Sequence, residues 1–128
     1  MKKLIFMLCV IIATLHPIPA LSDEYDKEWL PGDTILTASV CKSEEIILEV
    51  ARNDTISEEA ALNTIKAFTL AEDCLNVLPP IPFYVHSIVV DYKDFKKRPS
   101  VVLALQMIGD KHQNIVGYAI AAGRLGSI

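Results

Sequence analysis

Histidine, cysteine and glycine are scarce in this sequence of 128 residues, which has three histidines, three cysteines and five glycines. No two histidines or cysteines stand at the H-x-x-x-H or C-x-x-C spacing of a metal site. The sequence also lacks the G-x-S-x-G, Walker and G-x-G-x-x-G motifs of hydrolases and nucleotide-binding proteins. We therefore expect no metal and no cofactor, and these absences lower the expectation of an enzyme without excluding one.

Positive charge is also in short supply, with 12 lysines and arginines against 16 aspartates and glutamates and a formal net charge of −4 at pH 7. Most of the basic residues are scattered along the chain. An acidic protein of this kind is a poor binder of nucleic acid or anionic membranes, whose phosphates attract clustered lysine and arginine. We therefore expect no nucleic-acid partner.

The N-terminus carries the longest apolar run, at residues 4–15, directly after two lysines. A positive start followed by a short apolar stretch is the pattern of a secretory signal peptide. Pro17 and Pro19 interrupt the stretch, which is shorter than the roughly 20 apolar residues of a membrane span. The small residues in Ala20-Leu21-Ser22 provide a cleavage site, so residues 1–22 are predicted to be removed. The product is then periplasmic or secreted, with no stable membrane span.

Two alternatives to a cleaved leader are disfavoured. An uncleaved membrane anchor conflicts with the two prolines. A lipoprotein needs an acylated cysteine at the cleavage site, whereas Cys9 lies inside the apolar stretch after the bulky Leu8.

Removing 22 residues from 128 leaves 106, the size of one domain. The leader carries two lysines and no acid, so its loss takes the formal net charge from −4 to −6. Residues 23–33 are acidic and end in Pro31-Gly32, which predicts a flexible acidic arm in which Trp29 and Leu30 dock. Residues 34–128 then form a single small α+β domain.

Cleavage discards Cys9 and leaves Cys41 and Cys74, an even number of cysteines in an oxidising compartment. We predict one disulfide bond between them. A catalytic thiol is the alternative, and it is disfavoured because paired structural cysteines are usual in small exported domains. Closing the 33-residue separation is expected to stabilise the fold by about 3–4 kcal/mol.

Helix signals fill the segment between these two cysteines. Ser43 is a candidate N-cap for a helix over residues 43–52, which has apolar residues at helical spacing. Thr55 and Glu58 form a T-x-x-E capping box for a second helix over residues 57–73. Antiparallel packing of the two helices would bring the cysteines together, so the helical hairpin and the disulfide support each other.

The rest of the domain has strand signals. β-branched and aromatic residues predict a lead-in strand and three later strands, at residues 34–40, 83–92, 101–108 and 115–121. Other segments are predicted as an extended proline connector, a turn and a Gly-rich tail, at residues 78–82, 109–114 and 123–128. The strand at 101–108 is nearly all apolar, which is typical of a strand covered on both faces.

Alternation within residues 83–92 places five side chains on one face of that strand: Tyr84, His86, Ile88, Val90 and Tyr92. The element order predicts an α+β fold, with a lead-in strand, an antiparallel helical hairpin packed on the sheet, and then a three-stranded antiparallel β-meander.

One basic cluster stands out at residues 93–98 (KDFKKR). A solvated hairpin tip is the favoured interpretation, and a binding patch is the alternative. The side chains of the candidate binding surface come from this tip and from the last strand: Lys93, Phe95, Lys96, Lys97, Arg98 and Tyr118.

Only His86 and His112 remain after the leader is removed. His86 lies in a predicted strand and is interpreted as a packing residue, whereas His112 lies in a polar turn and is expected to be solvated. A metal site formed by these histidines with Asp91 is disfavoured, because nothing in their spacing brings them together.

The C-terminal half is similar in rhythm to bacterial SH3-like domains. Val77-Leu78-Pro79-Pro80 resembles their opening strand and turn, and Gly117-Tyr118-Ala119 resembles their closing G-W/Y-V signature. Ala119 stands where the family has valine, and the Gly-rich opening turn is missing. The likeness covers less than half of the mature chain and implies a binding module that contacts cell-wall or protein ligands.

Three functions fit these observations. The favoured one is an exported binding or interaction protein whose ligand is an unknown protein or a component of the cell envelope. The second is a secreted inhibitor or immunity-type protein that acts on a wall-degrading enzyme, since an acidic protein suits a basic target. The third is an unrecognised small hydrolase that uses His86 and nearby carboxylates.

Overall fold

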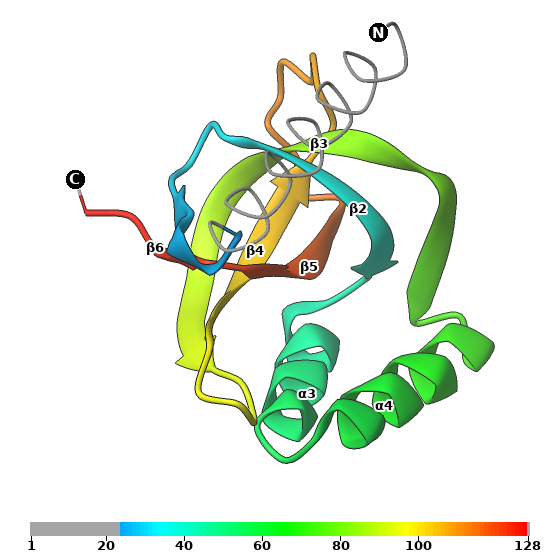
Figure 1. Ribbon diagram of the computed structural model, residues 1–128. Coiled ribbons are helices and arrows are strands. Elements are labelled where there is room, and N and C mark those ends of the chain that lie inside the picture. Colours follow the sequence, from blue (N-terminus) through cyan, green and yellow to red (C-terminus); the bar gives the residue numbers. More distant parts are fainter. Residues whose placement is uncertain (1–23, 128) are drawn as a thin grey trace, which may run out of the picture.

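The computed structural model describes residues 24–127, and the predicted leader lies outside them. Its elements follow one another in this order: 3-10 helix η1 (Glu24–Asp26), strands β1 (Glu28–Trp29) and β2 (Thr34–Cys41), helices α3 (Glu44–Asp54) and α4 (Glu58–Leu70), and strands β3 (Cys74–Lys93), β4 (Pro99–Gln106), β5 (Gly117–Ala122) and β6 (Arg124–Leu125). Figure 1 shows the two helices side by side at one end of a strongly curved sheet. The predicted α+β class, with a strand, a helical hairpin and then antiparallel strands, is confirmed.

Four strands form a closed antiparallel barrel in the order β2-β3-β4-β5. The predicted three-stranded antiparallel meander is β3-β4-β5, and the lead-in strand β2 joins it as a fourth strand. The length of β3 makes this possible: residues 74–84 pair with β2 and residues 84–93 pair with β4. A single 20-residue strand therefore joins both halves of the barrel.

The core has two parts. The barrel interior is filled by apolar side chains from every barrel strand and from β1: Trp29, Ile35, Phe83, Val85, Val101, Leu103, Leu105, Ala119 and Ala121. A second cluster joins the sheet to α3 around the cysteines: Cys41, Ile47, Val50, Ala51, Cys74 and Val102. Strand β4 contributes to both, and six of its eight residues are buried, as expected for a strand covered on both faces.

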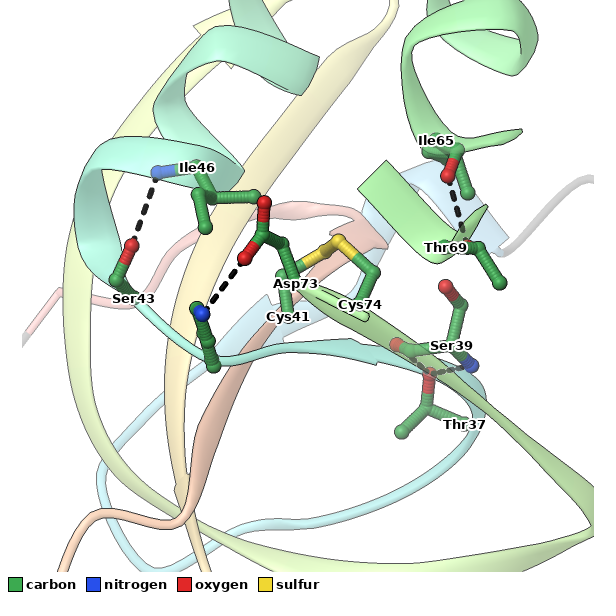
Figure 2. Close-up of a disulfide and its surroundings, with 10 residues drawn as sticks. Thr37, Ser39, Cys41, Ser43, Ile46, Ile65, Thr69, Asp73 and Cys74 are labelled. Atoms are coloured by element: carbon green, nitrogen blue, oxygen red, sulfur yellow. Dashed lines mark hydrogen bonds and ion pairs between the residues drawn. A yellow bond between two sulfur atoms is a disulfide. The ribbon is translucent and has the colours of Figure 1, made fainter. Parts of the chain in front are cut away.

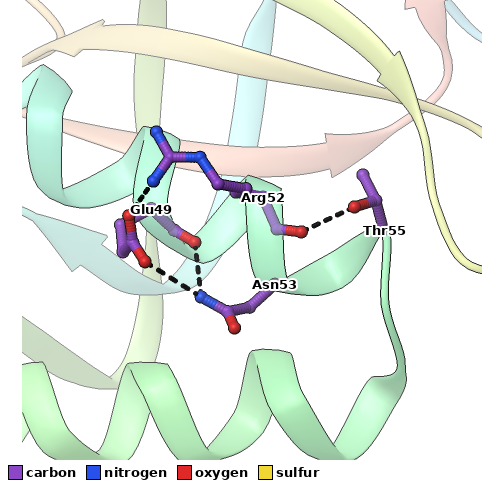
Figure 3. Close-up of polar contacts among 4 residues, drawn as sticks. All are labelled: Glu49, Arg52, Asn53 and Thr55. Carbon is purple, nitrogen blue, oxygen red and sulfur yellow. Dashed lines mark hydrogen bonds and ion pairs between the residues drawn. The ribbon is translucent and has the colours of Figure 1, made fainter.

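Serine side chains begin both helices. The Ile46 N–H donates to the Ser43 hydroxyl at 3.3 Å, as predicted. The predicted capping box at Thr55 was wrong, because Ser57 is the N-cap of α4 and accepts from the Ala60 N–H at 3.0 Å. Thr55 instead belongs to the end of α3, where its hydroxyl donates to the Arg52 carbonyl at 2.6 Å (Figure 3).

Helix α4 ends at Leu70, three residues before the predicted boundary at residue 73. Glu72 adopts a left-handed conformation with φ of 63°, and the Asp73 N–H donates to the Phe68 carbonyl at 2.8 Å. A left-handed residue with this backward bond is the usual way to stop a helix. The local sequence has no glycine there, so the pattern of apolar residues did not reveal the stop.

The proline segment at residues 78–82 is part of β3 and not a separate connector. Pro82 lies opposite Leu36 of β2, and the ladder skips from the pair Thr37↔Ile81 to the pair Ser39↔Asn76. The intervening residues 77–80 bulge out of the ladder, so their prolines need no partner for a missing N–H.

The predicted alternation along residues 83–92 was also wrong. The β3–β4 register shifts twice, between Val85 and Ser87 and between Ile88 and Val90. Each bulge reverses which face the following residues occupy. Ile88 therefore packs against the barrel interior and Tyr92 against the helix cluster, and the five side chains do not share one face.

The last two strands occupy slightly different positions from those predicted, with β4 at Pro99–Gln106 and β5 at Gly117–Ala122. Residues 107–116 form the turn between them. The chain after β5 was predicted as a Gly-rich tail, yet it forms β6, which pairs in parallel with β1. Figure 1 shows these two short strands beside each other at the edge of the barrel. Trp29 docks there as predicted and is 8% exposed.

Candidate functional site

Asp94 organises the basic hairpin tip between β3 and β4. Its carboxylate accepts from the N–H groups of Lys96 and Arg98 at 2.9 Å each, and from the Arg98 side-chain Nε at 2.8 Å. The Asp94 side chain is buried at the base of the turn, with the residue 4% exposed. Burial opposes its ionisation, but the bonds from Arg98 and Lys96 outweigh that effect and lower the pKa of Asp94.

The charges of the tip are therefore not equivalent. Arg98 is held by Asp94, and its guanidinium carbon lies 4.9 Å from the centre of the Tyr25 ring. The bond to Asp94 raises the pKa of Arg98. Lys93, Lys96 and Lys97 are exposed, as expected for a solvated hairpin tip.

The tip is attached to the end of α3 through Asp54. The Phe95 N–H donates to the Asp54 carbonyl at 2.9 Å, and the Tyr92 hydroxyl donates to the Asp54 carboxylate at 2.6 Å. Burial and the bond to Asp54 raise the pKa of Tyr92. These contacts give the tip a structural role that the charge pattern did not reveal.

Tyr118 does not join the basic residues of the tip. It lies near the start of β5, where it pairs with Cys41 and Ala104 and packs against the cluster around α3. The tip adjoins the other end of β5, since Ser100 pairs with Ala122. The predicted surface is therefore divided between two places.

The disulfide Cys41–Cys74 lies where β2 ends and β3 begins. Figure 2 shows it beside the start of α3. The two residues are direct cross-strand neighbours, with Cα atoms 3.9 Å apart. Lys42 and Asp73 form an ion pair directly beside the bond, at 2.6 Å. The predicted bond is confirmed, and it is consistent with an oxidising compartment.

The two histidines lie apart. His86 is half-buried on β3 and its Nδ1 lies 3.1 Å from the Ser87 hydroxyl oxygen. His112 is exposed in the 107–116 turn, as predicted. Asp91 is also exposed, and it lines an open hollow near Lys93 that includes neither histidine. Within residues 24–127 no three histidine, cysteine or carboxylate side chains are grouped to hold a metal ion.

An open hollow of about 350 Å³ lies beside His86. Within residues 24–127, the residues that line it besides His86 carry no acidic side chain: Pro31, Gly32, Tyr84, Val85, Gln106 and Gln113. The carboxylate that the hydrolase hypothesis requires is missing from these walls.

The barrel is only narrowly joined between β2 and β5. The two strands share a single ladder pair, Cys41↔Tyr118. If the ladder continued, Thr37 would lie opposite Ala122. Instead these two residues line a groove of about 400 Å³, within the size range of ligand sites.

The backbone of β2 turns unpaired groups toward this groove. The N–H and C=O groups of successive residues in an antiparallel strand point to opposite sides. The Val85 N–H donates to the Asp33 carbonyl at 2.8 Å, so the backbone groups of Asp33 face β3. By alternation, the backbone N–H and C=O of Leu36 point away from β3. The Cα partner of Leu36 on β3 is Pro82, which has no N–H to offer, and this agrees with that alternation.

The opposite wall, β5, also turns backbone groups toward the groove. The Gly123 N–H donates to the Pro99 carbonyl at 3.0 Å, which by alternation directs the groups of Ile120 and Ala122 toward β2. The Ala122 carbonyl accepts from the Trp29 Nε1 at 2.8 Å. One edge group of β5 is therefore occupied by a side chain of the same protein.

The charged residues at the groove differ in their pairing. Lys27 forms an ion pair with Asp33 at 3.5 Å and lies 4.9 Å from the centre of the Trp29 ring. Glu24 also lines the groove and is exposed. None of the ion pairs formed within residues 24–127 includes Glu24, so this part of the chain brings one unpaired negative charge to the groove.

Sequence reasoning missed both Asp94 and this groove. Asp94 was not singled out within the basic cluster, although an aspartate at the start of a turn often accepts from the backbone N–H two residues further on. Pro82 was a usable signal for the orientation of β2. Because proline has no N–H to donate, the residue opposite it, Leu36, is expected to turn its backbone groups away from β3.

No helix within residues 24–127 is long and apolar enough to cross a membrane. Comparisons of the chain with protein-family models, with curated proteins and with solved structures found no match.

Proposed function

We propose that this protein is a small exported binding protein, periplasmic or secreted, that holds a protein partner in the groove between β2 and β5. The observation that carries the proposal is the divergence of these strands after a single ladder pair, which leaves an open groove beside a strand edge. The predicted leader and the Cys41–Cys74 bond support an exported location.

A display selection tests the groove as a binding site. The disulfide-bonded protein from Asp23 onward is immobilised and used to select binders from a random peptide library. Leu36 is 66% exposed and lines the groove, so Leu36→Arg should block the site without disturbing the core. Leu78→Arg is the matched control, because Leu78 is 77% exposed and is not among the groove residues.

The selected peptides should lose affinity by about tenfold or more for Leu36→Arg, the size expected when a buried apolar contact is replaced by charge. They should bind Leu78→Arg as they bind the natural protein. Failure to select any specific peptide, or equal sensitivity to both variants, would contradict the proposed function.

Export is tested separately by N-terminal sequencing of material secreted from a bacterial host. The mature chain should begin at or within a few residues of Asp23. Recovery of the protein with Met1 intact in the membrane fraction would overturn the predicted cleavage.

The acidity of the mature chain favours one second candidate, an inhibitor of a basic wall-degrading enzyme. Loss of the leader takes the formal net charge to −6, because it removes two of the lysines from a chain of net charge −4. A lysozyme assay tests it, with inhibition expected at micromolar protein. No inhibition at that concentration would exclude lysozyme as the target of such an inhibitor.

A further inference from the structure

We propose that the groove takes an extended peptide segment of a partner protein, which adds as a strand to the free edge of β2 and places a lysine or arginine beside Glu24. This inference rests on the proposed binding function and names the chemistry of its ligand.

The edge of β2 determines the kind of ligand. Leu36 presents an N–H and a C=O toward the groove, and by the same alternation so does Thr34. An extended backbone offers matching groups at every second residue, and adding such a strand to an open sheet edge is a common mode of peptide recognition. Five residues of strand span about 17 Å, so a short peptide is long enough to use this edge.

The facing wall favours bonding of the new strand to β2 over bonding to β5. The Ala122 carbonyl is already engaged by Trp29, so β5 offers the groove only the backbone groups of Ile120 and the N–H of Ala122. Ile120, Ala121 and Ala122 instead offer apolar surface, together with the Trp29 ring. Small apolar side chains of the peptide would pack there while its backbone follows β2.

Charge complementarity indicates the basic residue. Lys27 at the groove is compensated by Asp33, and Asp26 nearby is compensated by Arg124 at 3.2 Å. Glu24 lines the groove and has no ion-pair partner within residues 24–127. A lysine or arginine at that end of the peptide would pair with it, and an acidic residue there would be repelled.

An N-methyl scan of a selected peptide tests strand addition. Methylating one backbone N–H at a time removes a donor and leaves the side chain unchanged. Every second position should lose about tenfold in affinity, the equivalent of roughly one hydrogen bond, while the positions between should tolerate methylation. A peptide that tolerates methylation everywhere would overturn strand addition. If such a peptide is still blocked by Leu36→Arg, the proposed function stands and only its ligand chemistry fails.

Amide hydrogen exchange of the natural protein provides a measurement that needs no variant. The Leu36 N–H should become protected when the peptide is bound, because it gains a backbone partner. The Ile35 N–H, which alternation directs toward β3, should change little. Unchanged exchange at Leu36 in the saturated complex would overturn the proposal.

The charge is tested with Glu24→Gln, which should weaken binding of a basic peptide by roughly two- to fivefold at low salt. Glu72→Gln is the matched control, since Glu72 is exposed beyond the end of α4 and is not among the groove residues. Selected peptides that are acidic, or equal effects of the two variants, would overturn the proposal that the ligand carries a basic residue.

Sedimentation of the free protein tests whether a second copy of the chain fills the groove. The protein should sediment as a monomer, and a dimer that Leu36→Arg abolishes would make a second copy the occupant in place of a peptide.

Discussion

Removal of the disulfide tests how much the bond between β2 and β3 stabilises the helical hairpin and the barrel. The bond closes a 33-residue separation that contains both helices. On the chain-entropy account, a loop of this length stabilises the folded state by about 4 kcal/mol. This is a large share of the 5–15 kcal/mol that is typical of a whole domain.

The replacement residue matters because the site is buried. Cys41 is 1% exposed and Cys74 is 4% exposed, and both lie in the cluster that joins α3 to the sheet. Paired substitution by alanine should cost about 4 kcal/mol and lower the thermal midpoint by roughly 15–30 °C. Paired substitution by serine should cost about 1–3 kcal/mol more, because two hydroxyls are then buried without designed partners.

Thermal and urea unfolding of the natural protein and of the two paired variants gives these differences directly. Mass spectrometry after non-reducing alkylation provides the control, since it shows whether Cys41 and Cys74 are bonded in the starting material. Hydrogen exchange should show the largest loss of protection in α3 and α4, which the bond encloses. A fully reduced protein with an unchanged midpoint would refute the reasoning, and so would a serine pair as stable as the alanine pair.

Three further predictions concern single substitutions. Asp94→Asn should cost roughly 1–3 kcal/mol in urea unfolding at pH 7, because the hairpin tip loses its charged acceptor. Since the pKa of Asp94 is lowered in the folded protein, its contribution is present above the ordinary value of 3.8 and is lost as the pH falls below it, and a constant difference throughout the acid range would contradict the assignment. Tyr92→Phe should cost about 1 kcal/mol at neutral pH by removing the bond to Asp54. Because the pKa of Tyr92 is raised, that cost should shrink as the pH rises above 10.0, and a cost that grows there would count against the raised pKa. Gly117→Ala should lower the thermal midpoint, because its Cβ would overlap the Val40 side chain, and an unchanged midpoint would show that the two strands have room there.

Local signals predicted the helical hairpin well. Ser43 caps α3 as expected, and the disulfide follows from the two cysteines that remain after the predicted leader. The cap depends on short-range chemistry and the disulfide on a count of cysteines, and a sequence displays both directly. The end of α4 was missed because Glu72 adopts a left-handed conformation that is uncommon for a residue other than glycine.

The sheet was harder to predict because its register depends on contacts between distant residues. The alternation in residues 83–92 was read as one uninterrupted strand, whereas two bulges reverse the faces within it. The proline segment at residues 78–82 was read as a connector for a similar reason. Pro82 is tolerated in β3 only because it lies opposite Leu36, and that pairing joins residues 46 positions apart in the sequence.

The candidate site depends on the same kind of distant pairing. Gly117 lets β5 approach β2 closely beside Cys41, since a Cβ there would overlap Val40. Further along β5, the Trp29 Nε1 donates to the Ala122 carbonyl, which would otherwise be available to pair with β2. Gly117 at one end of β5 and the Trp29 ring at the other together account for two strands that share one ladder pair and then separate. The groove is therefore built by the fold itself, and its β2 wall keeps the backbone groups of Thr34 and Leu36 available to a new strand, whereas on β5 the Ala122 carbonyl is already engaged.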